Sequence, residues 1–293
     1  MTSLRAGAPA AAAAQPMTRS NASTGRIYFW PGGSLWIGQG QGRTQWHAHH
    51  AHQLVVAPAG RFRFRTGEAG DWEGYEGALV PSHCSHQFEL DGLAVAHLFV
   101  EPESRAGRAL SQRFGGTAVA RIAAEEACAV ARPLFQVFAA TPAREPMVDA
   151  ASRAVARLAG ATTEPDRALD PRLTRALEHV RANVRGPVTL GEAAAVAALS
   201  ESRFRHLFVA ATGCSFRAYL LWLRINLAIE SVMAGASWTD AAHEAGFADS
   251  AHLTRTHKRM FGIEPTAIRA LAMPPPADAR GDRRPDGAAG LRP

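Results

Sequence analysis

Two patterns of hydrophobic and polar positions divide this chain. Between residues 27 and 101, apolar and polar residues alternate in short runs that glycines interrupt, which is the period-two pattern of half-buried strands. We predict strands at 34–38, 53–57, 61–66, 78–81, 86–90 and 93–100. Many short strands with glycine-rich turns are typical of a small antiparallel barrel or jelly roll.

Helical spacing replaces this alternation after residue 103. The predicted helices are 106–114, 118–139 with a break near Pro133, and 147–158. An apolar stripe on the second of them predicts core packing or a subunit contact, and it consists of Val130, Leu134, Val137 and Phe138. Asp170 followed by Pro171 predicts an N-cap with proline at the first helical position, and Gly186 and Pro187 end that helix.

The chain beyond this helix contains one motif twice. Residues 190–194 lie 48 positions before residues 238–242, and after the next turn the offset becomes 49. Each copy predicts a short helix, a tight turn and a second helix, with caps at Thr189, Ser200, Ser237 and Asp249. Glu192 completes a capping box with Thr189. This is a helix-turn-helix pair, the geometry that places a second helix in a major groove of DNA.

A further helix is predicted between the two copies. Apolar residues at 216, 220, 223 and 227 have helical spacing without an internal glycine or proline. A helix over 216–233 would be roughly 27 Å long. A rod of that length can hold two recognition helices about one DNA turn apart, roughly 34 Å, on one face of the duplex.

Individual residues at fixed places in these helices strengthen the pattern. They are Leu199, Ser200, Phe204, Leu207, Phe208, Gly213, Arg224, Ala228, Gly246, Phe247, Arg255, Lys258, Gly262, Pro265 and Arg269. In this order and spacing they resemble the signature of the AraC/XylS family of bacterial transcription regulators. The resemblance covers roughly the last third of the chain.

The resemblance implies a domain with two helix-turn-helix motifs that binds double-stranded promoter DNA. The positions that would read bases are Ser202, Arg205 and His206 in the first motif and Ser250, Ala251, Thr254 and Arg255 in the second. Arg203 and Arg259 either contact phosphate or are solvated surface charges, and Lys258 is a further candidate phosphate contact; such contacts position a protein without specifying sequence. His257 departs from the pattern, because the family usually packs an aromatic residue there, so the second motif could pack loosely or sense protonation.

Histidines in the strand-rich region form a second motif. His47-x-His49 is followed after three residues by Gln53 and after six more by Gly60. A second stretch contains Gly77, Pro81 and His86. This spacing resembles the two motifs of cupins, in which two histidines, a glutamate and a third histidine hold a divalent metal inside a barrel. Gln53 stands where cupins have the glutamate, and a neutral amide is a weaker ligand than a carboxylate.

Two interpretations of this motif stay open. His47, His49, Gln53 and His86 could hold zinc, nickel or copper, since three imidazoles suffice for these ions. They could instead line a pocket for an organic effector without metal, as in many AraC-type regulators, and no cofactor is then required. His50 favours neither interpretation.

Charge and composition add little to these patterns. The chain has 293 residues, 47% of them hydrophobic, and a net charge of +6, which leaves room for two domains and permits an acidic partner. Residues 170–271 hold twelve basic and nine acidic residues, a net of only +3, so the DNA prediction rests on placement. Three cysteines far apart, Cys84, Cys128 and Cys214, indicate no disulfide framework and fit a reducing cytoplasm.

The predicted fold class is therefore α+β with two domains. A cupin-like sensor barrel at 26–102 precedes helices at 103–160, a hinge at 161–169 and a double helix-turn-helix domain at 170–272. Tails at 1–25 and 273–293 are rich in Ala, Pro, Gly and Arg and are predicted to be disordered. The sequence contains no run of about 18 apolar residues, so it predicts neither a membrane segment nor a membrane partner. We therefore expect a cytoplasmic protein.

The favoured function is sequence-specific transcription regulation, in which the barrel senses an effector. By resemblance, the helices after the barrel make a homodimer, and a monomer in solution is the competing possibility. RNA polymerase is a further expected partner. The alternative is a cupin metalloenzyme tethered to DNA-binding helices, but no catalytic arrangement of side chains occurs elsewhere in the sequence, so no enzyme is predicted. The sequence names neither the effector, nor the promoter, nor the sign of regulation.

Overall fold

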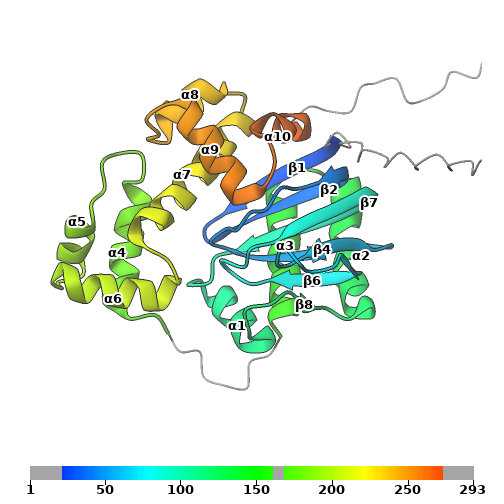
Figure 1. Cartoon of the computed structure of the whole chain (residues 1–293), viewed down its shortest axis with the longest axis horizontal. Helices are drawn as coiled ribbons and strands as arrows, with labels where there is room; N and C mark the ends of the chain where they lie inside the picture. Colours follow the sequence, from blue (N-terminus) through cyan, green and yellow to red (C-terminus); the bar gives the residue numbers. More distant parts are fainter. Residues whose placement is uncertain (1–21, 161–167, 273–293) are drawn as a thin grey trace, which may run out of the picture.

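The computed structural model describes residues 22–160 and 168–272, which form two domains (Figure 1). We call residues 22–160 the sheet domain and residues 168–272 the helical domain. The predicted α+β two-domain architecture is confirmed. Most of the predicted tails and hinge lies outside the described residues. The exceptions are 22–25 and 168–169.

The sheet domain contains one antiparallel sheet of eight strands. They are β1 Ala22–Trp30, β2 Gly33–Arg43, β3 His52–Val56, β4 Phe62–Arg65, β5 Glu73–Tyr75, β6 Gly77–Val80, β7 Gln87–Val100 and β8 Ala120–Arg121. Their order is β1-β2-β7-β3-β6-β8, and β4 joins β7 to β5. Strand β7 therefore organises the sheet, because it pairs with β2, β3 and β4 along its length.

The sheet differs from the prediction in several places. The sequence pattern predicted neither β1 nor β5, and β1 begins inside the predicted tail, where Ala22 pairs with Gln41 of β2. Strand β2 runs to Arg43, beyond its predicted end at residue 38. The two strands predicted at 86–90 and 93–100 are one strand, since a register shift between Gly40 and Gln41 accommodates the extra residue Gly92 opposite them. Strand β8 extends the sheet beyond residue 102, the predicted end of the barrel.

Three helices cover the sheet: α1 Arg105–Phe114, α2 Ala124–Ala140 and α3 Arg144–Ala159 (Figure 1). The predicted start of the second helix at residue 118 is wrong, because 120–121 pair with β6 as β8. The predicted break at Pro133 is wrong as well. Proline removes one helical hydrogen bond, but Val130 and Leu134 on either side are buried in the core that α2 shares with the sheet.

Close contact between α2 and the sheet depends on Gly77. A Cβ atom at this position would lie 2.5 Å from the Cβ of Ala127 on α2. Because of this contact, Val130 and Leu134 can reach a core with Leu54, Leu79 and Leu98 of the strands. Half of the predicted apolar stripe on α2 is therefore core, and its other half, Val137 and Phe138, is partly buried against the same cluster.

The helical domain consists of seven helices within the described residues. They are α4 Pro171–Ala182, α5 Leu190–Val196, α6 Glu201–Thr212, α7 Phe216–Met233, α8 Trp238–Glu244, α9 Ser250–Phe261 and α10 Pro265–Ala272. The predicted caps at Asp170, Thr189, Ser200, Ser237 and Asp249 are all confirmed by side chains that accept a backbone N–H of the first turn. Helix α4 ends at Ala182, before the predicted stop at Gly186. None of the described helices has the length and hydropathy needed to cross a bilayer.

The two domains share a hydrophobic core. Phe261 at the end of α9 packs on Trp36 of β2, with ring centroids 4.9 Å apart, and Trp36 packs on Phe99 of β7 at 5.3 Å. Trp222 of α7 completes the group at 6.1 Å from Phe261. Aromatic residues supply large buried areas and well-defined packing geometry, so these four rings fix the helical domain on the sheet domain.

His257 takes the place of the aromatic residue that we expected on α9. Its side chain is fully buried beside Trp238 and Phe261, and its Nδ1 lies 3.0 Å from the carbonyl oxygen of Ile263. Burial lowers its pKa to about 4, although the Ile263 carbonyl opposes this shift. The imidazole is therefore neutral at pH 7 and packs like the aromatic ring that it replaces, which excludes loose packing and protonation near neutral pH.

We expect His257→Phe to remove an acid sensitivity. The stabilisation associated with a histidine whose pKa is lowered on folding is complete above the unfolded value near 6.5 and is lost as pH falls from there towards 4. The wild type should therefore lose about 1.4 kcal/mol more than the variant between about pH 7.5 and 5.5. Urea unfolding at both pH values measures this difference. An equal loss in both proteins would contradict the assignment.

Candidate functional site

The first motif presents its predicted DNA-reading residues on one exposed face. Ser202, Arg205 and His206 of α6 are exposed, as is the predicted phosphate contact Arg203. On the opposite face Phe204 and Phe208 are fully buried in the core of the first motif. Helix α6 thus has one buried apolar face and one exposed polar face, which leaves the polar face free to enter a groove of DNA.

The second motif is more constrained. Ser250, Ala251 and Arg255 of α9 are exposed, but Thr254 is half-buried and its hydroxyl donates to the backbone oxygen of Ser250 at 2.9 Å. The two predicted phosphate contacts, Lys258 and Arg259, also differ. The ammonium group of Lys258 pairs with Glu264, whereas the side chain of Arg259 is exposed.

The end of α9 contacts residues 45–49 of the sheet domain, which we call the histidine segment. The backbone N–H of Gln45 donates to the carbonyl oxygen of Gly262 at 2.7 Å, and that of Ala48 donates to Arg259 at 3.3 Å. Gly262 has φ +68, and a Cβ atom there would clash with Gln45 and with the ring of His47. Only glycine fits such a left-handed position at close approach. The second recognition helix therefore ends against the predicted sensor site.

The structure brings the three predicted histidines together. His47 and His86 form an isolated β-bridge, and their ring centroids are 4.1 Å apart. His49 lies 5.9 Å from His47 and 5.3 Å from His86. All three side chains are buried, and one ring nitrogen from each lies within 4.8 Å of the other two. We call His47, His49 and His86 the histidine triad.

Backbone carbonyls orient each imidazole of the triad. Nδ1 of His47 lies 2.9 Å from the oxygen of Gln45, Nδ1 of His49 lies 2.8 Å from that of Ala51, and Nδ1 of His86 lies 2.9 Å from that of Cys84. A carbonyl accepts, so hydrogen on each Nδ1 satisfies these contacts and leaves each Nε2 with a free lone pair. Nε2 of His86 has no hydrogen-bond partner.

Electrostatics keeps the triad neutral. Burial, together with the neighbouring imidazoles, lowers the pKa of His47 to about 3 and that of His86 well below its usual value. Burial also lowers the pKa of His49 to about 4, although hydrogen bonds to Gln53 and Ala51 oppose this shift. Neutral imidazoles with free lone pairs are the form in which histidine binds metals.

Gln53 connects the triad to a fourth histidine. Its Oε1 lies 2.9 Å from Nε2 of His49, and its Nε2 lies 2.8 Å from Nδ1 of His97. Burial lowers the pKa of His97 to about 4, and nearby His49 adds to this shift. Oε1 of Gln53 and an unprotonated Nε2 are both acceptors, so either a cation lies between them or the amide is turned to donate to His49.

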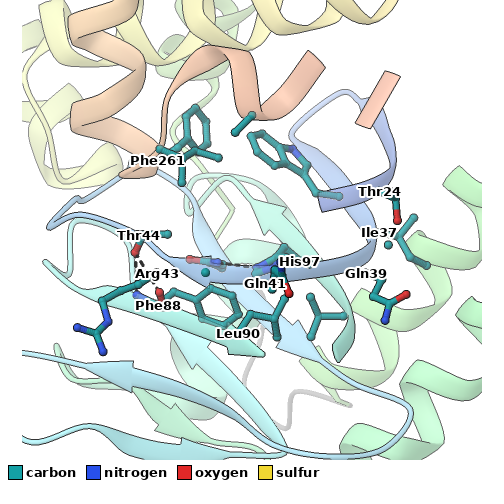
Figure 2. Close-up of a pocket in the computed structure, with 18 of the residues that line it drawn as sticks. Thr24, Ile37, Gln39, Gln41, Arg43, Thr44, Phe88, Leu90, His97 and Phe261 are labelled. Atoms are coloured by element: carbon teal, nitrogen blue, oxygen red, sulfur yellow. Dashed lines mark hydrogen bonds between the residues drawn. The ribbon is translucent and has the colours of Figure 1, made fainter. Parts of the chain in front are cut away.

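A cavity of about 140 Å³ adjoins this group (Figure 2). His47, Gln53 and His97 form one polar side, and apolar side chains of β2 and β7 form another side, among them Ile37, Phe88, Leu90 and Val95. Further polar residues also line it: Thr24, Gln39, Gln41, Arg43 and Thr44. The helical domain closes it with Phe261, Ile263 and Ala267. In Figure 2, Phe261 lies above the cavity, and His97 and Leu90 lie below it. A molecule bound here would contact both domains.

Sequence reasoning missed two kinds of lining residue. His97 alternates in phase with Val95 and Phe99 along β7, so the strand period could have placed it beside the triad. Phe261 gave no such signal, because its contact with Trp36 joins residues 225 positions apart in different domains.

Comparison with known families supports the predicted class of the helical domain. Residues 193–270 match a family described as a helix-turn-helix domain. No curated protein sequence matches the chain. The match runs from within α5 into α10 and includes every residue of the predicted AraC/XylS signature, from Leu199 to Arg269.

Two solved structures of ToxT are similar to this chain in fold. ToxT from Vibrio cholerae O395 covers 86% of this chain and 96% of its own, with 11% identity and a TM-score of 0.52. ToxT bound to (E)-4-(8-methylnaphthalen-1-yl)but-3-enoic acid covers 87% and 100%, with 10% identity and a TM-score of 0.51. An AraC-type DNA-binding domain from Chromobacterium violaceum covers 36% of this chain and 95% of its own, at 27% identity and a TM-score of 0.34.

The two comparisons agree with the prediction for this chain. Residues 193–270 match a helix-turn-helix domain, and the fold of both domains is similar to that of ToxT. The helix-turn-helix prediction for the helical domain is therefore confirmed, and the resemblance to AraC/XylS-type regulators is supported.

Proposed function

We propose that the chain controls transcription by binding promoter DNA with α6 and α9 and by changing its DNA affinity when an effector binds in the sheet domain. The observation that carries this proposal is the composition of the cavity wall. Phe261, Ile263 and Ala267 belong to the segment that ends α9 and begins α10, yet they face the same cavity as His47 and His97. An effector that contacts these residues can shift the end of the second recognition helix.

The cavity favours a small, mostly apolar molecule. Its volume of about 140 Å³ is close to that of an engineered protein cavity of about 150 Å³ that binds benzene. His97 and Gln53 offer a polar end, at which a carboxylate or hydroxyl group would find donors. The structure of ToxT with a naphthalene-bearing acid supports this class of ligand by analogy.

A divalent transition metal is the second candidate effector. The triad offers three neutral imidazoles whose Nδ1 positions are occupied by carbonyls, and such outer contacts are usual for histidines that bind metals. Nε2 of His49 and Oε1 of Gln53 are both acceptors and lie close together. A metal bound to both atoms would explain why two acceptors face each other. Zinc, nickel and copper suit imidazole ligands.

Other parts of the proposal come from family resemblance. We expect α2 and α3 to join two copies of the chain and RNA polymerase to be a partner. The metalloenzyme alternative would require turnover at the triad, where the described metal-ligand group includes no carboxylate. Aerobic turnover assays of the iron-loaded chain would distinguish an enzyme from a regulator.

Two neighbouring arginines of α6 should have different effects on DNA binding. Arg205→Ala should remove a bidentate contact to guanine worth about 1 to 3 kcal/mol and relax preference at one base step. Arg203→Ala should weaken binding to all sequences alike, because phosphate contacts carry no sequence information. Titration of both variants with a mapped promoter and a scrambled duplex measures this contrast. Equal losses on both duplexes for both variants would reject the assignment.

Filling the cavity should abolish the response to small ligands. We expect at least one of benzoate, indole and octanoate to raise the melting temperature of the wild type by several degrees at saturation. Val95→Phe should remove that shift, because its ring would occupy the space of the ligand. Leu93→Phe lies on the same strand outside the cavity and should preserve the shift. Equal shifts in both variants would place the binding site elsewhere.

The metal version predicts a difference between two histidine variants. The wild type should bind one more equivalent of nickel than His86→Ala, which lacks one ligand of the triad. His97→Ala changes a histidine outside the triad and should bind as much nickel as the wild type. Equilibrium dialysis with elemental analysis, on variants shown to be folded by circular dichroism, gives the count. If His86→Ala takes up as much nickel as the wild type, the triad is not a metal site.

A further inference from the structure

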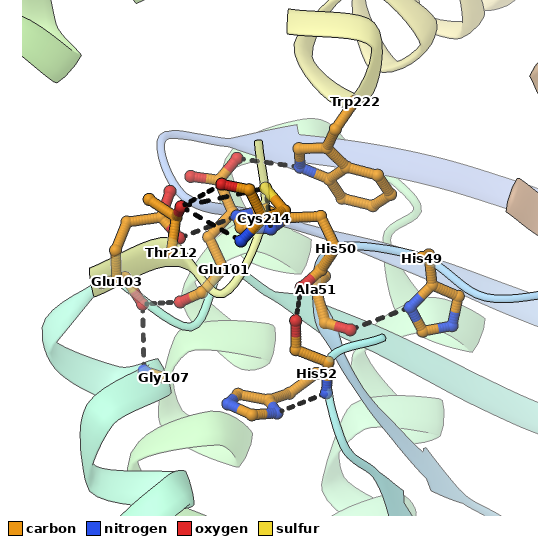
Figure 3. A network of polar contacts seen from close by, with 12 residues as sticks. His49, His50, Ala51, His52, Glu101, Glu103, Gly107, Thr212, Cys214 and Trp222 are labelled. Carbon is orange, nitrogen blue, oxygen red and sulfur yellow. Dashed lines mark hydrogen bonds and ion pairs between the residues drawn. The ribbon is translucent and has the colours of Figure 1, made fainter. Parts of the chain in front are cut away.

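A second cluster of metal-ligand side chains lies at the junction of the domains. His50 and His83 come from the sheet domain, and Cys214 follows α6 in the helical domain. Nδ1 of His50 lies 3.6 Å from Sγ of Cys214, and the ligand atoms of all three residues lie within 4.8 Å of one another. Figure 3 shows His50 beside Cys214, with Glu103 nearby. None of these residues lines the effector cavity.

The backbone on both sides is shaped to bring the cluster together. His83 has φ +62, in the left-handed region that residues other than glycine adopt uncommonly. Its ring lies against Gly213, the left-handed C-cap of α6, where a Cβ atom would come within 3.3 Å of it. Strained conformations of this kind cost free energy and persist mainly at functional sites. The strain here holds an exposed imidazole over a cysteine of the other domain.

Carboxylates and an arginine orient His50 for ligation. Nε2 of His50 donates to Oε2 of Glu103 at 2.9 Å, and Oε1 of Glu103 accepts from Arg181 of α4 at 3.1 Å. Arg181 also donates to Glu101 at 2.7 Å. A carboxylate that fixes one imidazole nitrogen and aims the other at a metal is the usual outer contact of metal-binding histidines. Here the nitrogen aimed at Cys214 is Nδ1.

The cysteine is activated by its surroundings. Burial raises the pKa of Cys214, but the contacts with His50 and His83 outweigh burial and lower it to about 7. The thiolate is the form of cysteine that binds metals. Soft thiolate together with imidazole selects zinc and similar ions over magnesium or calcium.

We propose that His50, His83 and Cys214 bind a zinc ion that joins the two domains. Zinc bonds of about 2.3 Å to sulfur and 2.0 to 2.1 Å to nitrogen give a tetrahedral edge of about 3.6 Å between these atoms, which matches the observed separation of Sγ and Nδ1. The ion replaces the proton shared by Nδ1 of His50 and Sγ of Cys214, and that proton leaves to solvent. Three protein ligands leave a fourth position for water.

Such a site has a mechanical consequence for the first motif. Cys214 lies two residues beyond the last residue of α6, the first recognition helix. Bound zinc would therefore hold the end of α6 on the sheet domain, as the Gln45 to Gly262 hydrogen bond holds the end of α9. The site does not depend on the identity of the cavity ligand. It makes the spacing of the two recognition helices sensitive to metal.

Cobalt titration of the full-length, metal-free chain tests the proposal. One equivalent of Co²⁺ should produce a near-ultraviolet thiolate-to-cobalt charge-transfer absorption, which zinc then removes by displacement. Cys214→Ser should lose this absorption completely, and His83→Ala should weaken cobalt binding at least tenfold. Cys84→Ser and Cys128→Ser change the other two cysteines and should keep the wild-type spectrum.

The design separates this site from the histidine triad. The triad offers only nitrogen ligands, so cobalt bound there gives no thiolate absorption. The His83 side chain is exposed, so its removal should leave the fold intact, and circular dichroism checks this for each variant. Absence of the charge-transfer absorption in the wild type, or its survival in Cys214→Ser, would overturn the proposal.

Discussion

The packing of Phe261 on Trp36 is the contact on which the arrangement of the two domains depends. It inserts the end of the second recognition helix into a core made with Phe99 and Trp222. Burial of apolar surface is the main favourable term in such association, whereas the polar contacts around it mainly set orientation. The same ring also lines the cavity beside the histidine triad. Stability of the domain junction and access to the cavity are therefore properties of one cluster.

Polar contacts at two places fix the orientation of the two domains at this junction. At the end of α9, Gly262 accepts a hydrogen bond from the histidine segment. Arg181 near the end of α4 pairs with Glu103, and Cys214 just after α6 faces His50. Trp222 donates to Glu101 at 3.1 Å. Buried charges are costly unless they are paired, so these groups specify one orientation of the helical domain. Both recognition helices are in this way attached to the domain that would receive the signal.

Local patterns in the sequence predicted the helical domain well. Each cap depends on one side chain and a backbone N–H two or three residues away, so Thr189 and Asp249 could be placed without knowledge of the fold. The strand boundaries were less predictable. Whether residues 86–100 form one strand or two depends on Gly40 and Gln41 of a partner strand, which lie about fifty positions earlier. Period and propensity do not contain that information.

The sites show the same limit. The spacing of His47, His49 and His86 brought the triad into view, since cupin-like motifs are local in sequence. The pairing of His50 with Cys214 joins residues 164 positions apart and depends on how the domains dock, so no local pattern could reveal it. His97 lies between these cases. The sequence analysis missed it, although strand alternation puts it in phase with Val95 and Phe99, but its contact with Gln53 depends on the pairing of β3 with β7.

The joint core also constrains how this protein can change over evolutionary time. A substitution at Trp36 in the sheet domain alters the surface on which Phe261 of the helical domain packs. It is therefore tolerated best together with a compensating change in α9. Exchange of one domain between related regulators would break the same fit. We therefore expect the sheet domain and the helical domain to be inherited together, with positions 36, 99, 222 and 261 varying together among descendants of this chain.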